Sequence, residues 1–427
     1  MSVLLKRISP FIFAILFVTA NTYARVLPQV LTGADVLVEN NFAEIAGKNV
    51  GLITNQTAVT RSGQHIADLL FQSEQVHLVA LFSPEHGIRG KSEAGKSVRE
   101  KFDPGTGLPV FSLYGTAKKP TREMLQNIDV LVFDIQDVGT RFYTFISTMS
   151  LALEAAAENN IPFVVLDRPN PISGNIVEGP VLDKTLQSFV GIHPIALRHG
   201  MTVGELAKMF VGEGWINDAA RARLTVIKMR NWQRSMDFKE TGLEWIKPSP
   251  NMTNLQTALL YPGMGLLEAT NISEGRGSKF PFQKIGAPWI NGKQLKRCLD
   301  SLSFQGVVID TTLFTPLDIP GVASHPKYLG KRCSGLVLTV TDPYHFHAVS
   351  FGIHLLCAVR DLYPNNLKIN DNSIKKLVGS VRVCEMLENG TNAERIIQSW
   401  QSGLGHFLKI RKKYLLYNET LLRREKL

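Results

Sequence analysis

The sequence predicts an α/β protein: a Rossmann-like, doubly wound parallel sheet followed by a second, smaller mixed α/β C-terminal domain. The first observation is that short apolar runs alternate with helical patterns between residues 50 and 227. The second is that several of these runs end in polar residues, as strands do at the carboxyl edge of a parallel sheet. The third is that the alternation stops at a Pro-rich polar stretch, residues 247–251.

The strands of the sheet are predicted from β-branched and aliphatic runs bounded by turn residues. Between them lie segments whose apolar residues recur at helical spacing, such as Gln64 to Ser73 with Ile66, Leu69 and Leu70 on one face. The expected strands are 50–55, 76–80, 108–113, 129–135, 162–167 and 224–227, and the expected helices are 64–73, 121–126, 142–159 and 202–212. Regular alternation of this kind favours parallel strands covered by helices on both faces.

The change in pattern at residues 247–251 predicts a domain boundary. We expect a catalytic domain over residues 25–250 and a mixed domain over residues 251–427 that completes a cleft. In the second domain the sequence predicts a helix over 255–267, strands over 306–310 and 335–341, and several helices from residue 348 onward.

The first 24 residues have the pattern of a secretory signal peptide. Lys6 and Arg7 precede an apolar core over residues 11–18, and small residues end at Ala24, after which we expect cleavage. An uncleaved membrane anchor is the alternative, but the apolar stretch is shorter than the roughly 20 residues that a spanning helix needs. We therefore expect an exported protein, periplasmic or secreted, with no stable membrane span after cleavage.

Charge and composition restrict the partners. The 427-residue chain has 44% hydrophobic and 20% charged residues, which is ordinary globular composition, and its formal net charge is +10. Loss of the two basic residues of the signal leaves +8, which suits anionic partners such as cell-wall polymers or acidic sugars. Nucleic acid is not expected, because no basic run with interleaved aromatic residues occurs.

Metal and nucleotide sites are not expected. The four cysteines, Cys298, Cys333, Cys357 and Cys384, lack zinc-cluster spacing and could be either disulfides or buried thiols. Residues 90–97 match the phosphate-loop pattern, but the preceding strand ends well before them and a Pro-Gly turn follows, so the loop does not run from strand to helix. We therefore expect no cofactor and no bound nucleotide.

The stretch from Leu81 to Gly90 is the strongest candidate for catalysis. Glu85 directly follows a buried strand, where open α/β sheets hold their ligands. His86 adds a second titratable group and Arg89 a cation within the same loop. We expect Glu85 to be a catalytic group, and the alternative is a helix cap or an ion pair with Arg89.

Further polar residues follow other predicted strands. Asn55, Asp134 with Asp137, and Asp167 each lie at or just past a strand end, so parallel strands would bring them to one edge of the sheet. Taken singly, each is more typical of a turn or a helix cap. The loops that follow add the candidate substrate-binding residues Arg141, Tyr143, Arg168 and Asn170. For the Asp167–Arg168 segment, a salt-bridged turn is the alternative.

A glycine-rich polar stretch, residues 270–278, opens the second domain. It contains Glu274 and Arg276, and Arg276 has a glycine on each side. The glycines let the backbone approach a ligand, while a guanidinium offers paired hydrogen bonds to a carboxylate. A simple linker turn is the alternative.

Several of these motifs together resemble the exo-β-N-acetylmuramidases of the NamZ type, a family formerly described as a domain of unknown function. With residues 281–283 and 286–289, the matching stretches extend over nearly all of the mature chain. The resemblance departs at Lys91-Ser92-Glu93, where relatives would be more acidic. The matching motifs are residues 51–57 (GLITNQT), 83–87 (SPEHG), 134–144 (DIQDVGTRFYT), 167–171 (DRPNP) and 271–277 (NISEGRG).

The resemblance implies a glycoside hydrolase whose cleft removes a terminal N-acetylmuramic acid from the non-reducing end of peptidoglycan fragments, in cell-wall turnover and recycling. A glycosidase needs a protonated acid and usually a second carboxylate. We expect Glu85 to be the acid, and the sequence does not rank Asp134, Asp137 and Asp167 for the second role or decide between retention and inversion.

Two other functions would use a similar cleft. A non-catalytic envelope protein could bind muropeptides or sugars with the same arginines, and release of free N-acetylmuramic acid separates it from an enzyme. A metal-dependent wall hydrolase would be inhibited by chelators, but the sequence shows no metal-ligand spacing such as His-Glu-x-x-His.

Overall fold

The computed structural model describes residues 29–85, 87–90 and 102–418. The expected signal peptide, His86 and residues 91–97 of the phosphate-loop match lie outside the described residues, as does the Lys91-Ser92-Glu93 departure. Across the described ranges, no helix combines the length and the apolar character needed to cross a membrane.

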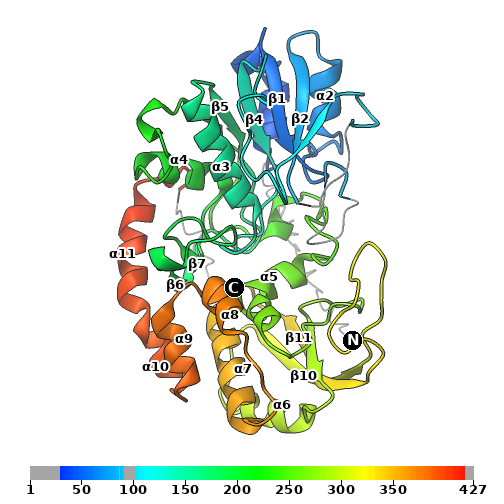
Figure 1. Cartoon of the computed structure of the whole chain (residues 1–427), viewed down its shortest axis with the longest axis vertical. Coiled ribbons are helices and arrows are strands. Elements are labelled where there is room, and N and C mark those ends of the chain that lie inside the picture. Colours follow the sequence, from blue (N-terminus) through cyan, green and yellow to red (C-terminus); the bar gives the residue numbers. More distant parts are fainter. Residues whose placement is uncertain (1–28, 86, 91–101, 419–427) are drawn as a thin grey trace, which may run out of the picture.

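A six-stranded, fully parallel sheet forms the centre of the N-terminal unit (Figure 1). The strand order is β3-β2-β1-β4-β5-β8, so the chain reverses its direction of growth between β1 and β4. This is the order of a Rossmann fold, as the sequence predicted. The strands are β1 (Asn49–Thr54), β2 (His77–Ser83), β3 (Val110–Ser112), β4 (Val130–Asp134), β5 (Phe163–Leu166) and β8 (Leu224–Ile227).

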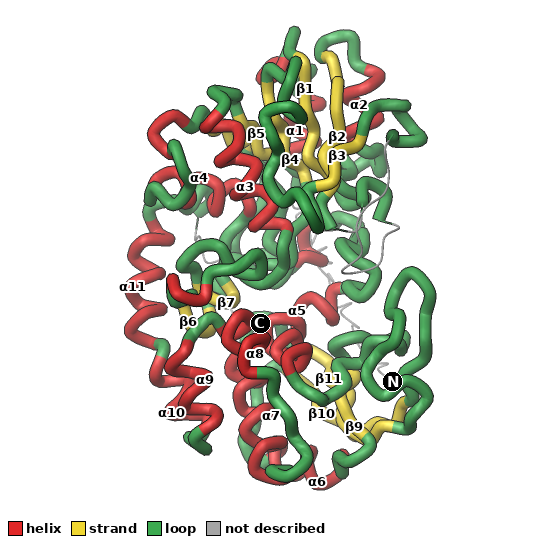
Figure 2. Tube along the Cα trace, viewed as in Figure 1, coloured by secondary structure: helices red, strands yellow, loops and turns green. Residues whose placement is uncertain are grey.

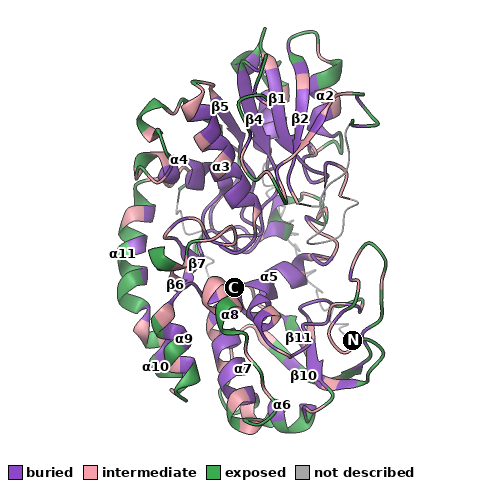
Figure 3. Cartoon of the chain, viewed as in Figure 1, coloured by how far each residue is buried: buried purple, intermediate pink, exposed green. Residues whose placement is uncertain are grey.

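Helices cover both faces of this sheet, because the central strands carry apolar side chains on both of their faces. In β4, Val130 and Val132 pack with α1 and α2, whereas Leu131 and Phe133 pack with α3 and α4. Figure 3 shows the sheet and α3 as buried. The helices are α1 (Gly33–Glu39), α2 (Ile66–Gln72), α3 (Phe145–Glu158) and α4 (Val203–Gly212). The expected helix at 121–126 forms turns instead.

The C-terminal unit contains a three-stranded antiparallel sheet in the order β10-β11-β9. Helices α5 and α7 pack closely at Gly263. A Cβ there would lie 2.0 Å from the carbonyl oxygen of Ala348, so this approach requires glycine. Its strands are β9 (Lys284–Ala287), β10 (Val307–Phe314) and β11 (Cys333–Val340), and its helices are α5 (Leu255–Met264), α6 (Gly292–Asp300), α7 (Ala348–Leu362), α8 (Asp371–Val378), α9 (Val381–Glu388) and α10 (Ala393–Ser399). The four cysteines of this unit are free thiols.

The last helix of the described chain packs on the N-terminal unit. The sequence instead assigns all of residues 251–427 to the second domain. Helix α11 (Gln401–Lys412) lies against the antiparallel pair β6 (Glu178–Val181) and β7 (Ala196–Arg198) (Figure 1). Arg411 on this helix donates to the carbonyl oxygens of Gly174 and Gly200. The two units are therefore joined by the hydrophobic core at their contact and by this returning helix.

Candidate active site

A cavity of about 260 Å³ lies where the two units meet. Loops fill this region between the two sheets (Figure 2). Glu85 enters the cavity from the carboxyl end of β2, and Tyr143 from the loop that follows β4. The opposite wall comes from the C-terminal unit, with Tyr261 on α5, Glu268 in the short 3-10 helix Gly265–Ala269, and Arg276 beyond it.

Glu85 is half-buried and is held by residues of its own unit. The Thr144 hydroxyl donates to Glu85 Oε2 at 3.2 Å. The Tyr114 hydroxyl also bonds to Glu85. Burial, together with the negative charge and the hydrogen bond of Glu85, raises the pKa of Tyr114 to about 12. Both donors fix the carboxyl group at the cavity wall, where a bound sugar could receive its proton.

Arg276 faces the cavity from the other unit. Its Nη2 lies 2.5 Å from Glu268 Oε1, and its Nε lies 3.3 Å from Glu274 Oε1. The guanidinium also stacks over the Phe282 ring, 5.2 Å from the centroid. Burial opposes the charge of Arg276, but the two carboxylates outweigh it and raise its pKa above the ordinary value. Arg276 is therefore a permanent, well-oriented cation in the cavity.

Glu274, which the sequence suggested for binding, lies behind Arg276 rather than in the cavity. It is buried, and its Oε2 accepts a hydrogen bond from Lys327 Nζ at 2.9 Å. Lys327 also donates to the carbonyl oxygens of Leu267 at 2.8 Å and Ile272 at 3.1 Å. This network fixes the segment from Leu267 to Glu274, which contains Glu268 and directly precedes the Gly275–Arg276 pair.

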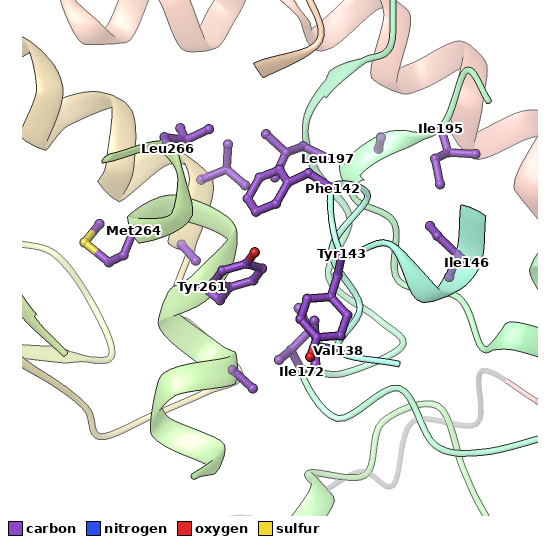
Figure 4. Packing of buried hydrophobic residues seen from close by; sticks show 14 of the residues in the cluster. Val138, Phe142, Tyr143, Ile146, Ile172, Ile195, Leu197, Tyr261, Met264 and Leu266 are labelled. Atoms are coloured by element: carbon purple, nitrogen blue, oxygen red, sulfur yellow. The ribbon is translucent and has the colours of Figure 1, made fainter. Parts of the chain in front are cut away.

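Two tyrosines connect the walls. The rings of Tyr143 and Tyr261 meet edge to face with centroids 5.8 Å apart, and Phe142 packs on Tyr261 at 5.1 Å (Figure 4). Burial raises the pKa of both phenols, so they are neutral hydrogen-bonding groups at physiological pH. They give the cavity an aromatic wall on which a sugar ring can pack.

Asn55 and Asp167 directly follow β1 and β5, and Asp134 is the last residue of β4, so all three lie at the expected edge of the sheet, but they do not line the cavity. Asn55 accepts hydrogen bonds from the Thr57 backbone at 3.0 Å and hydroxyl at 2.6 Å. Asp134, fully buried, is paired with Arg168. These groups therefore do not face a common cleft as the sequence predicts. Their side chains instead bond to neighbouring loops and stabilise them.

Asp167 is likewise fully buried and satisfied. It accepts hydrogen bonds from Thr202 Oγ1 at 2.8 Å and from the Gly204 amide at 2.9 Å, next to the first turn of α4. Arg168, besides its pairing with Asp134, donates to the Val59 carbonyl at 3.0 Å. The salt-bridged turn that was the alternative for this segment is thus what forms, although Arg168 pairs with Asp134 rather than with its neighbour.

Other predicted binding residues have structural partners too. Arg141 is 1% exposed and donates to the carbonyl oxygens of Pro180, Ile195, Leu377 and Val378. Burial lowers its pKa to about 9. A guanidinium enclosed by four carbonyl groups does not face the cavity that Arg276 lines.

Arg89 and Asn170 also serve the local structure. Arg89 pairs with Asp103 at 2.9 Å and with Asp68 at 3.0 Å, rather than with Glu85. Asn170 accepts from the Ile172 amide at 3.1 Å and donates to the Met201 carbonyl at 3.0 Å.

Asp137 is buried and does not line the cavity, but its charge acts on Tyr143, which does. Its Oδ2 accepts from the Gly139 amide at 2.7 Å, and His199 Nε2 lies 3.6 Å from the same oxygen. The Met201 amide donates to His199 Nδ1 at 3.2 Å, which places a ring proton on the nitrogen that faces Asp137. Asp137 is therefore oriented by its surroundings but has no direct access to a ligand in this cavity.

Several cavity residues lie outside the motifs that the sequence singles out, namely Tyr114, Phe189, Ser249, Asn251, Tyr261 and Glu268. Glu268 follows an apolar helical run and resembles an ordinary helix-end residue. Its only signal in the sequence is its proximity to the stretch at 270–278. Within the part of the chain that the structure describes, no group of three or more His, Cys, Asp or Glu side chains could hold a metal ion.

Comparison with known proteins identifies the family. Residues 50–256 match the family model of the exo-β-N-acetylmuramidase NamZ N-terminal domain, and residues 259–417 match that of its C-terminal domain. A peptidoglycan β-N-acetylmuramidase NamZ of Bacillus subtilis is 48% identical over 391 residues, which is 91% of this chain and 92% of that protein.

Solved structures agree with this match. Two crystal structures of DUF1343 family proteins from Bacteroides fragilis superpose with TM-scores of 0.85 and 0.75, at 37% and 32% identity. The first alignment covers 91% of this chain and 99% of the other, and the second covers 92% and 100%. The chain therefore belongs to the NamZ exo-β-N-acetylmuramidase family of glycoside hydrolases.

Proposed function

We propose that this protein is an exo-acting glycoside hydrolase that releases N-acetylmuramic acid from the non-reducing end of peptidoglycan fragments. The observation that carries the proposal is the presence of Glu85 and Arg276 on facing walls of one cavity between the units. Glu85 supplies a proton donor for the leaving oxygen. Arg276 supplies a cation for the lactyl carboxylate, the group that distinguishes this sugar from N-acetylglucosamine.

The dimensions and lining of the cavity support exo action. A volume of about 260 Å³ accommodates about one sugar unit rather than a long glycan segment, and its aromatic wall of Tyr143 and Tyr261 suits a pyranose ring. A cavity of this size suits a terminal residue, whereas an internal residue needs a longer groove that also holds its neighbours. The substrate class is therefore a saccharide that begins with N-acetylmuramic acid.

We also propose that the protein acts outside the cytoplasm, in wall turnover and recycling. The charge and apolar pattern of residues 1–24 supports export, and an exported enzyme would meet wall fragments directly. Cell fractionation that detects a chain shortened by about 24 residues in the periplasm or medium would agree with this proposal. A full-length chain in the cytoplasm would contradict it.

A defined disaccharide tests the activity. With N-acetylmuramic acid linked β-1,4 to N-acetylglucosamine, we expect equal amounts of the two free sugars. A trisaccharide capped with N-acetylglucosamine at the non-reducing end should stay intact until the cap is removed. Cleavage of the capped substrate would contradict exo action, and binding of the disaccharide without release would instead indicate a sugar-binding protein.

A further inference from the structure

We propose that Glu268 is the second catalytic carboxylate, opposite Glu85. This inference rests on the proposed glycosidase function and assigns a residue to the role that the sequence left open. Among the carboxylates of the described residues, Glu85 and Glu268 are the two that line the cavity between the units. Asp134, Asp137 and Asp167, the candidates from the sequence, are each 5% exposed or less and do not line it.

The two glutamates come from opposite walls. Glu85 follows β2 of the N-terminal unit, and Glu268 belongs to the 3-10 helix that continues α5 of the C-terminal unit. Tyr261 lies within the electrostatic reach of both carboxylates, and each of them favours its neutral phenol. A sugar bound in the cavity would therefore meet walls that each carry one carboxyl group, the pair that glycosidases use.

The contacts of Glu268 leave it available to a ligand. Its side chain is 28% exposed, and Oε1 is held by Arg276 at 2.5 Å. Lys327 fixes the backbone of the same turn through the Leu267 carbonyl. One oxygen is thus anchored and the group is oriented, while the surface of the carboxylate still faces the cavity.

Glu274 provides an internal comparison. It pairs with the same arginine, at 3.3 Å, but its side chain is only 5% exposed and Lys327 holds its other oxygen. Glu274 therefore positions Arg276 from behind, whereas Glu268 meets Arg276 at the cavity surface. The same ion-pair network thus contains one positioning carboxylate and one that can reach substrate.

The proposed chemistry needs only water as co-reactant. Glu85 transfers its proton to the glycosidic oxygen as the bond from C1 to that oxygen breaks, and the carboxylate of Glu268 stabilises the positive charge that develops at C1. Water finally supplies hydroxide to C1. Its proton goes to Glu268 if water attacks directly, or returns to Glu85 if Glu268 first forms a glycosyl ester. The products are free N-acetylmuramic acid and a saccharide with a new hydroxyl group.

The test compares Glu268→Gln with Glu85→Gln on two substrates, the disaccharide and an aryl N-acetylmuraminide with an activated leaving group. Loss of the acid should harm the disaccharide more than the aryl substrate, which needs less protonation. Loss of the second carboxylate should lower kcat on both by a similar factor, roughly 10²–10⁴-fold. Glu274→Gln is the matched control: it removes the same charge from the same arginine and should change mainly KM.

Chemical rescue separates catalysis from structure. Addition of formate or azide to Glu268→Ala should restore part of the turnover, because a small anion can occupy the space of the missing carboxylate, and no rescue is expected for Glu274→Ala. Should Glu268→Gln not fold, Glu268→Asp gives the same test, with a reduced kcat at an unchanged melting temperature.

A folded Glu268→Gln enzyme with wild-type kcat on both substrates, or a fully active Glu268→Asp enzyme, would overturn the assignment. This outcome differs from failure of the proposed function, in which the wild-type enzyme itself releases no N-acetylmuramic acid.

Discussion

The hydroxyl of Tyr417 donates a hydrogen bond of 2.6 Å to the carboxylate of Asp167, joining the end of the described chain to the carboxyl end of β5. The two residues are 250 positions apart in sequence. Asp167, which the sequence suggested for catalysis, is thus part of the contact that holds the segment after α11 on the N-terminal unit.

The Asp167–Tyr417 contact should make stability depend on pH. Burial raises the pKa of Asp167 to about 7 from an ordinary value of 3.8, while the Tyr417 hydroxyl opposes this shift by bonding the ionised form. The folded state therefore binds more protons than the unfolded state between these values, and stability falls as the pH rises through about 7. Tyr417→Phe should cost about 1–3 kcal/mol, and more at pH 8 than at pH 5.

Urea unfolding at the two pH values measures this difference. Asp167→Asn, which cannot ionise, serves as control and should flatten the dependence between pH 4 and 7. Equal losses for Tyr417→Phe at pH 5 and pH 8 would contradict the role of the ionised carboxylate.

His193 should produce the opposite dependence at lower pH. Burial lowers its pKa to about 4, and the neutral ring bonds Ser150 at 2.6 Å and packs on Phe210 at 4.2 Å between centroids. A depressed pKa means that this stabilisation is present above the ordinary value of 6.5 and is lost as the pH falls through about 4. His193→Gln should lower the melting temperature by several degrees at pH 7 but remove part of the acid sensitivity. A His193→Gln variant with unchanged sensitivity between pH 4 and 6.5 would refute this.

Glu85→Gln should abolish most of the turnover while leaving the fold intact. As the general acid, its loss should reduce kcat on the disaccharide by roughly 10²–10⁴-fold, with a small change in KM. Thr144→Val, which removes one hydrogen bond to Glu85 Oε2, should cause a smaller fall in kcat. Steady-state kinetics and thermal melting of the same preparations check both. A well-folded Glu85→Gln enzyme with near-normal activity would remove Glu85 from the mechanism.

Arg276→Leu should erase the preference for muramic over glucosamine substrates, because it removes the cation at the cavity wall. The ratio of kcat/KM for the two disaccharides measures this preference. Arg276→Lys keeps the charge but loses the planar fork, so it should retain only part of the preference.

Arg141→Leu is the contrasting variant. Arg141 bonds four carbonyl oxygens away from the cavity wall, so its loss should reduce stability rather than selectivity. If Arg276→Leu keeps the wild-type preference while folded Arg141→Leu loses it, the anchor has been assigned to the wrong arginine.

The parallel sheet could be predicted because its signal is local. The runs that form β1, β2, β4 and β5 are mostly apolar, with polar residues near their ends, because strands buried on both faces are apolar on both sides. The position of Glu85 just past β2 could be predicted for the same reason, because the apolar run of β2 is visible in the sequence. Residues 121–126 form turns where the sequence predicts a helix, because a short polar segment has too little periodicity to distinguish the two.

The fold class, the sheet edge at which Glu85 stands and the family motifs around it can all be predicted from local sequence. Which polar residues face a ligand depends instead on how distant segments pack. Asp134 and Asp167 stand at strand ends as Glu85 does, and Arg141 lies in a loop after β4, but all three are buried and bonded by partners from distant segments. Glu268 has no distinctive local signal in the sequence. It becomes part of the site because the packing of the two units places it opposite Glu85. Long-range contacts of this kind form the cavity wall, and no local pattern encodes them.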